Sequence, residues 1–411
     1  MSFLTEPQRK QVFNSVLKTI ERKFVNPKKT SPDIGSLRGN FEHEITSAVD
    51  AQSFEAAMNR MLHALGASHT GFFHESKPRA GGKIALAATF MKADTPDGAR
   101  WVFQDVHPGG SADNANIVPG DVLLTIDEAE TTAAEPLAFQ LGQEYTLGIR
   151  RTDGTAASVQ VTLPGSKEKK RPLIVPDKVV VARKLAADIG LIRVSMFPGV
   201  LGMDVARDMS GAVADLDADR LIFDLRGNSG GGIGCLRLMS LLCADVRGVG
   251  YSLGKKQIAN GTPEESLARF GRIPSSKLQV LPLALRFATA GRAVAVFTEG
   301  LGDRQHHGRT VLLVNEHSAS ATEMVAAFAS EERLAHVVGV KTPGRLVGAS
   351  SFKVGHGYRV ALPVAVYLTW AGQNLEGVGV APDTECGISF EDLRSGRDPQ
   401  LERAQEIARQ L

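Results

Sequence analysis

Apolar residues recur at spacings of three and four near the start of the chain, and this period indicates helices. Residues 9–25 and 54–65 show it most clearly. We predict that residues 7 to about 75 are helical, and we assign residues 1–76 to a helical N-terminal region. The tract at residues 76–82 is rich in turn-forming residues and marks a boundary.

Past that boundary, short apolar runs alternate with glycine, aspartate and proline turns, a pattern typical of strands. Residues 101–127 follow the order strand, proline-glycine turn, short helix, then the turn Pro119-Gly120-Asp121 into a strand. This run resembles a PDZ domain, and we interpret residues 82–165 as a PDZ-like β domain. PDZ domains bind extended peptide ends by adding a strand to a sheet edge, so the resemblance implies a polypeptide partner. The alternative is a PDZ domain that only braces or covers its neighbour.

The remaining region, residues 175–411, alternates apolar strands with helical segments. Its predicted strands lie at residues 189–196, 221–225, 311–314 and 337–340. Strands interleaved with helices predict a layered α/β domain. The expected fold class is therefore multidomain and mixed α/β, with a helical N-terminal region, a PDZ-like β domain and a layered α/β core.

Composition narrows the class of protein. A chain of 411 residues is too long for one ordinary core. Hydrophobic residues make up 43% and charged residues 22% of the chain, which is typical of a soluble globular protein. The net charge is only +2, and the basic run at residues 167–171 is interpreted as a solvated linker, so we expect no nucleic-acid partner. No apolar stretch approaches the length of a transmembrane helix, so we expect no membrane partner either.

The cysteines and the N-terminus indicate the cellular compartment of the protein. Cys235, Cys243 and Cys386 are sparse and lack the spacing of metal ligands, which indicates reduced thiols. The first ten residues contain a glutamate and no apolar core after a basic start, so we expect no secretion signal and a cytoplasmic address. Neither a metal nor a cofactor is expected, and the pattern leaves the oligomeric state open.

Ser320 is the first candidate catalytic residue. It opens a helix-like segment that follows the apolar run at residues 310–314. A serine at a strand-to-helix turn can be held at the top of a sheet, beside the free N–H groups of the helix. Such groups stabilise the oxyanion that forms when a serine attacks a carbonyl. The alternative is a helix cap, because Ser320 and Glu323 have the spacing of a capping box.

A glycine-rich turn is the second candidate. In residues 221–234 an apolar strand ends in this turn, and a helical pattern follows at residues 235–243. Glycines let backbone N–H groups converge on an anion or a developing oxyanion. Nucleotide binding is excluded, because the turn lacks the Gly-Lys-Ser/Thr of a P-loop and has Cys235 where the dinucleotide pattern needs glycine.

Four motifs together resemble the core of the tail-specific, or C-terminal-processing, serine peptidases. They are Asp224-Leu-Arg-Gly-Asn-Ser-Gly-Gly231, Val314-Asn-Glu-His-Ser-Ala-Ser-Ala-Thr-Glu323, Val337-Val-Gly-Val-Lys-Thr-Pro-Gly344 and Gly377-Val-Gly-Val-Ala-Pro-Asp383. The order of regions is also that of the family, whose core is crotonase-like or ClpP-like. The resemblance implies that Ser320 is the nucleophile. It also implies that the oxyanion donors are the N–H groups of Ala321 and of Gly230 or Gly231, whereas Ser318 and Thr322 have capping and packing roles.

One position departs from the Ser-Lys members of that family. They carry a lysine in a Gly-Lys-Gly turn, where this chain has Gly344-Arg345-Leu346. Arginine stays protonated over the useful pH range, so it cannot accept the proton of the serine. Lys341 and Lys353 are nearby in the sequence but out of register with the motif.

Residues 61–70 offer another base, because they resemble the Ser-His segment of the tricorn-type branch of the same clan. In that branch the histidine is the general base, and the serine before it joins a relay with a late glutamate. The resemblance implies His69 as base, with Ser68 and Glu376 in the relay. Lysine-type members can also carry a structural histidine at this point. The rival histidines are His63, His74 and His317.

The resemblance thus implies a serine endopeptidase that hydrolyses peptide bonds of polypeptide substrates through an acyl-enzyme. The alternative is a non-catalytic protein that keeps its domains to bind peptides or, as in retinoid-binding relatives of this core, an apolar ligand. Hydrolysis of esters or other acyl compounds is a third hypothesis.

Overall fold

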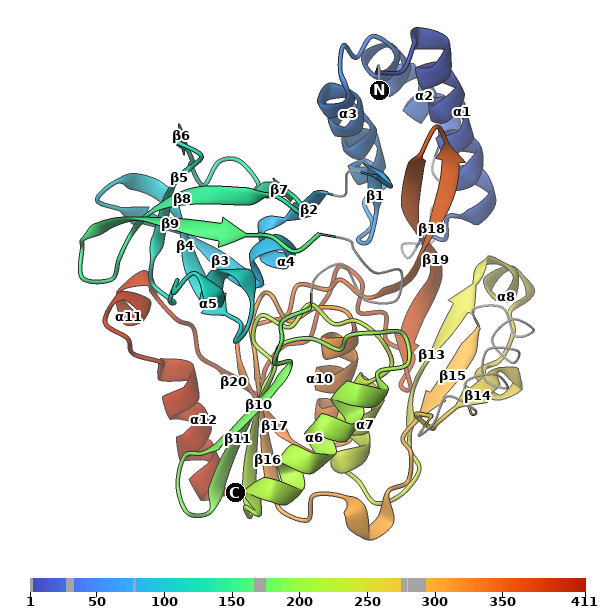
Figure 1. Ribbon diagram of the computed structural model, residues 1–411. Helices are drawn as coiled ribbons and strands as arrows, with labels where there is room; N and C mark the ends of the chain where they lie inside the picture. The colour runs from blue at the N-terminus through green and yellow to red at the C-terminus, as the bar shows by residue number, and fades with distance from the viewer. Residues whose placement is uncertain (1–2, 27–32, 77–78, 166–174, 275–278, 280–292) are drawn as a thin grey trace.

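The computed structural model describes residues 3–26, 33–76, 79–165, 175–274, 279 and 293–411. These residues form a helical unit, a β domain and a layered core that pack together (Figure 1). The predicted linker at residues 167–171 lies outside the described residues. In the part of the chain that the structure describes, no helix is long and apolar enough to cross a membrane.

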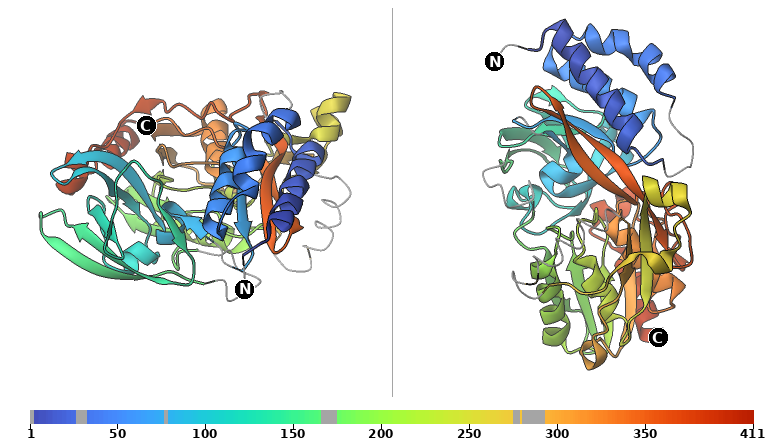
Figure 2. Two further views of the ribbon diagram at one scale, coloured as in Figure 1. Left: turned by 90° about the horizontal axis from the view of Figure 1, so that it is seen from above. Right: turned by 90° about the vertical axis from the view of Figure 1, so that its right-hand side faces the viewer.

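The first unit contains three helices and a hairpin that comes from much later in the chain. The helices are α1 (Glu6–Lys23), α2 (Ile34–Thr46) and α3 (Ala51–His63). The hairpin is formed by β18 (Val347–Gly355) and β19 (Tyr358–Thr369), and it runs alongside the helices (Figure 2). Phe54 of α3 packs edge-on against Tyr358 of β19, and both are buried in one apolar cluster. The two predicted helices are therefore confirmed.

The helical prediction is wrong at its C-terminal end. Residues Gly71–His74 form strand β1, which pairs antiparallel with β19 and places Gly71 opposite Ala361. The helical period ends at His63, and positive φ angles at Gly66 (65°) and His69 (57°) then turn the chain. Pairing with a strand about three hundred residues later decides the conformation here, which no local period can reveal.

The β domain has a five-stranded path in which β3 (Ala88–Thr95), β4 (Gly98–Val106), β5 (Val122–Ile126), β8 (Glu144–Arg150) and β9 (Ala156–Thr162) are neighbours in that order. Its smaller elements are β2 (Arg79–Gly81), α4 (Gly82–Leu86), α5 (Ser111–Asn114), β6 (Ala129–Glu130) and β7 (Ala138–Gln140). The predicted order of strand, turn, short helix, turn and strand is confirmed at β4, α5 and β5. The PDZ assignment stays a prediction.

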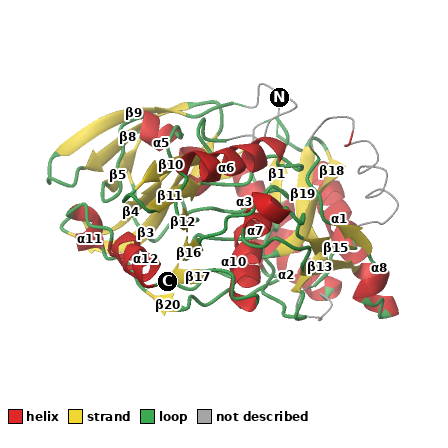
Figure 3. Ribbon diagram, turned by 90° about the horizontal axis from the view of Figure 1, so that it is seen from below, coloured by secondary structure: helices red, strands yellow, loops and turns green. Residues whose placement is uncertain are grey.

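The core is built on a second sheet, whose order is β10 (Val180–Lys184), β11 (Ile189–Val194), β12 (Arg220–Asp224), β16 (Arg309–Val314), β17 (His336–Gly339) and β20 (Thr384–Glu385). All neighbours are parallel except β10 and β11. Helices α6 (Met203–Leu216), α7 (Cys235–Leu241) and α10 (Ala321–Glu331) cover one face, and α12 (Pro399–Gln410) covers the other (Figure 3). The layered α/β prediction and its four strands are confirmed.

A further sheet in the core was not predicted. Its path is β1, β19, β13 (Gly248–Gly254), β15 (Val294–Phe297) and β14 (Ala268–Phe270), and β18 also pairs with β19. Two further short α-helices are α8 (Lys255–Asn260) and α11 (Phe390–Arg394). All three cysteines are free thiols, as predicted, and Cys235 and Cys243 are buried.

The parallel sheet gathers the candidate segments at one edge. Strands β12, β16 and β17 are adjacent and parallel, so their carboxyl ends meet at the same edge. The segments that follow them are the glycine-rich turn after Asp224, the turn to Ser320 after Val314, and the turn to Arg345 after Gly339. In open α/β sheets this edge is where ligands bind.

Candidate active site

Ser320 lies at the N-cap of α10 in a strained backbone conformation, with φ 59° and ψ −120°. Residues other than glycine rarely adopt a positive φ, and such strain clusters at functional sites. The Ser320 N–H donates to Glu323 Oε2 at 3.0 Å, but the Ser320 hydroxyl makes no capping hydrogen bond. Ser320 and Glu323 therefore have the arrangement of a capping box, as the cap alternative predicted. The Glu323 N–H donates to the Ser320 carbonyl at 2.8 Å, which leaves the hydroxyl oxygen available for chemistry.

The glycine-rich turn packs directly against Ser320. The Ala319 N–H donates to the Asn228 carbonyl at 2.9 Å, and a Cβ on Gly230 would lie 2.7 Å from the Ser320 Cβ. A Cβ on Gly231 would lie 2.1 Å from the Phe197 carbonyl oxygen, so glycine is required there as well. The two segments therefore fit together only because these positions lack side chains.

The predicted oxyanion donors differ in availability. The Gly230 N–H donates to Asn228 Oδ1 at 2.8 Å, so it is already engaged. The N–H groups of Gly231 and Ala321 donate to no acceptor within the described residues. Ala321 is also the first residue of α10, where helix geometry leaves N–H groups unpaired and the helix dipole favours negative charge.

The neighbouring hydroxyls are structural, as predicted. Ser318 is fully buried, and its hydroxyl donates to the Leu225 carbonyl at 2.9 Å while accepting from the Asn315 N–H. Thr322 is fully buried too, and its hydroxyl donates to the Asn228 carbonyl at 3.1 Å. Both side chains fasten the nucleophile segment to the glycine-rich turn.

Glu376, Ser68 and His69 form one continuous hydrogen-bonded chain. Glu376 Oε1 accepts the Ser68 N–H at 2.7 Å, and Glu376 Oε2 accepts the Ser68 hydroxyl at 2.9 Å. Ser68 Oγ lies 2.7 Å from His69 Nδ1. Since the single hydroxyl proton of Ser68 goes to Glu376, Ser68 Oγ must accept from Nδ1–H. This arrangement leaves Nε2 of His69 unprotonated, which is the form of a general base.

The electrostatic surroundings of His69 favour its neutral form. His69 is exposed, yet the surrounding protein displaces enough water to lower the pKa of its imidazole. The Glu376 carboxylate opposes this shift, and the Arg345 guanidinium adds to it. A lowered pKa keeps the base unprotonated at neutral pH.

The rival residues are placed elsewhere. His63 is exposed at the end of α3, and His74 Nε2 lies 3.2 Å from the His356 carbonyl oxygen. His317 Nε2 lies 3.0 Å from the Phe90 carbonyl oxygen, in the β domain. The side chains of Lys341 and Lys353 are exposed, and Lys353 lies on the long hairpin.

Glu323 is a residue whose wider role the sequence did not reveal. It is fully buried, and its carboxylate accepts four hydrogen bonds at 2.7–3.0 Å. The donors are the Ser320 N–H, the Thr342 hydroxyl, and the N–H groups of Gly344 and Arg345. One carboxylate therefore fixes the nucleophile segment to the Arg345 turn, although the spacing had suggested only a local capping box.

Replacing Glu323 with alanine is expected to lower the free energy of unfolding by about 3–5 kcal/mol, because four donors lose their buried acceptor. Urea unfolding of the variant measures this loss. Glu331→Ala is the matched control, since it removes an exposed glutamate from the other end of the same helix. Equal stability of the two variants would show that the Glu323 hydrogen bonds do not support the fold.

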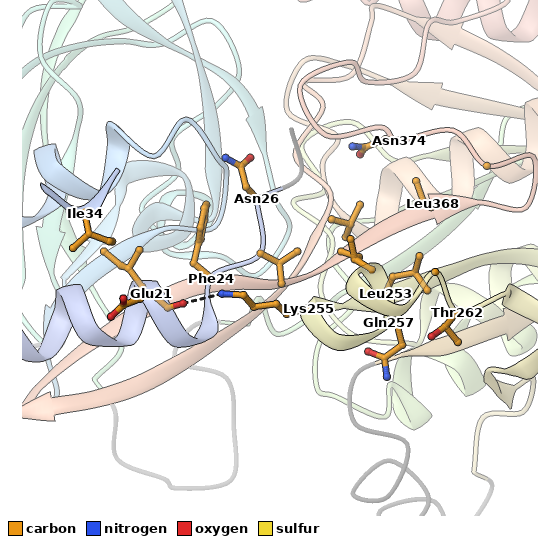
Figure 4. Close-up of a pocket in the computed structure, with 16 residues that line it drawn as sticks. Glu21, Phe24, Asn26, Ile34, Leu253, Lys255, Gln257, Thr262, Leu368 and Asn374 are labelled. Atoms are coloured by element: carbon orange, nitrogen blue, oxygen red, sulfur yellow. Dashed lines mark hydrogen bonds between the residues drawn. The ribbon is translucent and has the colours of Figure 1, made fainter. Parts of the chain in front are cut away.

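A large pocket of about 810 Å³ lies beside this site, between α1, α8 and β19 (Figure 4). Ser320, His69 and Glu376 are not among the residues that line it. It meets the relay through Asn374, whose Oδ1 accepts the Glu376 N–H at 3.1 Å. The candidate catalytic residues therefore lie outside this pocket. Within the described residues, no group of three or more histidine, cysteine, aspartate or glutamate residues is placed to hold a metal ion.

The candidate site places a serine at the N-terminus of a helix that follows a strand of a parallel sheet. Residues 188–386 match the model of peptidase family S41. The match covers slightly less than half of the chain, and this part of the chain is similar to that peptidase family.

The chain is also similar to individual proteases. The chain is 26% identical over 317 residues to a carboxyl-terminal-processing protease of Synechocystis sp., covering 73% of this chain and 62% of that protein. A tricorn protease homologue of Streptomyces coelicolor is 35% identical over 103 residues, covering 25% of this chain and 10% of that protein. The matches span 54–65% of the length of three processing relatives.

A solved structure gives the same fold. The photosystem II D1 C-terminal processing protease matches with a TM-score of 0.56 at 16% identity, covering 92% of this chain and 93% of that one. At this identity the match supports the mixed α/β fold only. The expectation of a mixed α/β fold is therefore confirmed, whereas the PDZ-like domain and the exact domain layout stay predictions.

Proposed function

We propose that this chain is a serine endopeptidase that hydrolyses polypeptides through an acyl-enzyme, with Ser320 as nucleophile and His69 as general base. The observation that carries the proposal is the chain from Glu376 through Ser68 to His69, which leaves Nε2 of the imidazole as a proton acceptor. It supplies a base in a protein whose family lysine is replaced by Arg345.

The proton moves twice in the proposed cycle. His69 Nε2 takes the proton of Ser320 as the hydroxyl attacks the carbonyl carbon of the scissile bond, and then gives it to the leaving amine. In the second half the base activates water, which releases the new carboxyl end from Ser320. The Glu376 carboxylate stabilises the imidazolium that forms in each half, because it raises the pKa of His69.

The oxyanion is held by backbone groups. We propose the N–H groups of Gly231 and Ala321 as donors, because neither is engaged within the described residues while the Gly230 N–H is bound to Asn228. Each such donor is typically worth about 3 kcal/mol in the transition state. The positive end of α10 adds to the stabilisation.

Polypeptides are the proposed substrates. The processing proteases that this chain resembles are named for carboxyl-terminal processing, and the β domain has the element order of a PDZ domain. We propose that the β domain helps to recruit extended peptide segments by adding a strand to a sheet edge.

Replacing Arg345 with alanine is expected to leave substantial turnover, within about tenfold of wild type, because its backbone N–H and not its side chain binds Glu323. The rising limb of the pH–rate profile should move to higher pH, since the guanidinium lowers the pKa of His69. Arg345→Lys keeps the cation and should leave the limb in place. An inactive Arg345→Ala protein would contradict the relay.

The direct test of the function is digestion of a peptide library, with mass spectrometry of the products and of protein treated with a serine-directed phosphonate. We expect cleaved peptides and phosphonate on Ser320 only. The absence of both would favour a non-catalytic binding protein, whereas ester cleavage without peptide cleavage would favour another acyl hydrolase.

A further inference from the structure

Lys83 reaches from the β domain into the segment that carries the nucleophile. It lies on α4, and its Nζ donates to the His317 carbonyl at 2.5 Å, three residues before Ser320. The same side chain lines a small cavity of about 40 Å³ together with Gly227 and Ser229 of the glycine-rich turn. Lys83 therefore binds one of the two segments that form the proposed oxyanion site and shares a cavity with the other.

Each residue at the start of the nucleophile segment is bound by the β domain. Asn315 Nδ2 donates to Asp105 Oδ2 at 2.9 Å, and Gln104 Nε2 donates to Glu316 Oε1 at 2.9 Å. His317 contacts the Phe90 carbonyl oxygen through its ring and Lys83 through its own carbonyl. This is an ordered polar interface, and not the loose contact expected if the domain only covered its neighbour.

The interface also reaches the glycine-rich turn. The Gly227 N–H donates to Asn315 Oδ1 at 3.0 Å, so the residue that binds Asp105 also binds this turn. A change in how the β domain is seated would therefore move both halves of the proposed site. Displacements of about 1 Å in catalytic geometry can cost on the order of a hundredfold in rate.

The charge on Lys83 is poorly hydrated. Its surroundings lower its pKa to about 8, mainly through burial. The carboxylates of Asp105 and Glu316 oppose this shift, and Arg345 adds to it. Two further titratable groups near the lysine are His107 and His317; burial lowers their pKa values most, and Lys83 lowers them further. Loss of the proton leaves a neutral amine, a weaker donor to the His317 carbonyl than the charged ammonium.

We propose that Lys83 is a positioning residue for hydrolysis: its ammonium holds the 315–320 segment so that Ser320 faces its base, which makes the β domain part of the catalytic apparatus. The proposal rests on the proposed peptidase function. It predicts two effects that a lysine with only a packing role would not give. First, loss of the cation must change kcat more than KM. Second, activity must fall as the lysine loses its proton.

The test compares Lys83→Met, Lys83→Arg and the control Lys92→Met, which removes an exposed lysine from β3 of the same domain. Steady-state hydrolysis of a peptide gives kcat and KM from pH 5 to 10, and the rate of phosphonate labelling of Ser320 reports on the nucleophile. Thermal unfolding checks that each variant is folded.

We expect Lys83→Met to lower kcat and the labelling rate together by on the order of ten- to a hundredfold, with KM nearly unchanged. Wild type should lose activity above about pH 8, where the ammonium is lost. Lys83→Arg should retain most of kcat and lose this alkaline fall, because arginine stays protonated. Lys92→Met should behave as wild type.

Two results would overturn the inference alone: wild-type kcat in folded Lys83→Met, or an unchanged alkaline fall in Lys83→Arg. Wild-type protein in which Ser320 neither reacts with the phosphonate nor supports hydrolysis would overturn the proposed function as well. The two failures are therefore distinguishable.

Discussion

Replacing Ser320 with alanine is expected to lower kcat/KM for peptide hydrolysis by at least about a thousandfold, because the acyl-enzyme can no longer form. The fold should survive, since the Ser320 hydroxyl makes no capping hydrogen bond and its N–H is kept in the variant. The hydroxyl does not hold the strained φ of 59° in place either, so its removal should leave the backbone unchanged. Hydrolysis rates and phosphonate labelling, measured beside the unfolding temperature, separate loss of chemistry from loss of fold.

The matched control is Ser318→Ala, two residues earlier in the same segment. Its buried hydroxyl binds Leu225 and Asn315, so this variant should lose about 1–3 kcal/mol of stability yet still react with the phosphonate at Ser320. The opposite pattern, with labelling lost in Ser318→Ala and kept in Ser320→Ala, would move the nucleophile to Ser318. Full hydrolysis by Ser320→Ala would end the serine-peptidase assignment.

The strands of the core could be predicted because each is a short apolar run buried on both faces. The alternating residues of β12 show why: Leu221 and Phe223 pack toward α6, α7 and α10, whereas Ile222 packs toward α12. Continuous hydrophobic runs of this kind are typical of parallel strands covered on both sides. Local sequence therefore carries the signal.

The sheet that joins the helical unit to the core could not be predicted in the same way. Strand β1 has only four residues, and its partner β19 lies almost three hundred positions later. Nothing local indicates such a pairing, and the helices before it biased the expectation toward helix. The relay depends on this pairing, since Ser68 and His69 stand in the turn just before β1 and Glu376 follows β19.

Two polar residues also have roles that the sequence could not predict. Glu323 and Lys83 act through partners from distant segments, the Arg345 turn in one case and the nucleophile segment in the other. In the sequence, Glu323 is explained by a capping box with Ser320. Lys83, in a short helix, is explained by an exposed position in solvent. Only the hydrogen bonds to distant segments show that both side chains have wider roles.

Replacing His69 with alanine is expected to reduce kcat/KM by about a thousandfold or more, because the variant loses the proposed general base for Ser320. Added imidazole should restore part of the activity of His69→Ala and none of that of Ser320→Ala. His63→Ala, which removes an exposed histidine from the end of α3, is the control and should hydrolyse peptides like wild type.

The pH–rate profile tests the same base in the intact protein. Desolvation by the surrounding protein lowers the pKa of His69, so the neutral base is populated above that lowered value and activity should rise through a pH below about 6.5. Glu376 raises this pKa, so Glu376→Gln should move the rising limb to still lower pH while slowing the reaction. A lysine base would instead give a limb well above neutral pH. If the His69→Ala protein stayed active and showed such an alkaline limb, the general base would be a lysine and not His69.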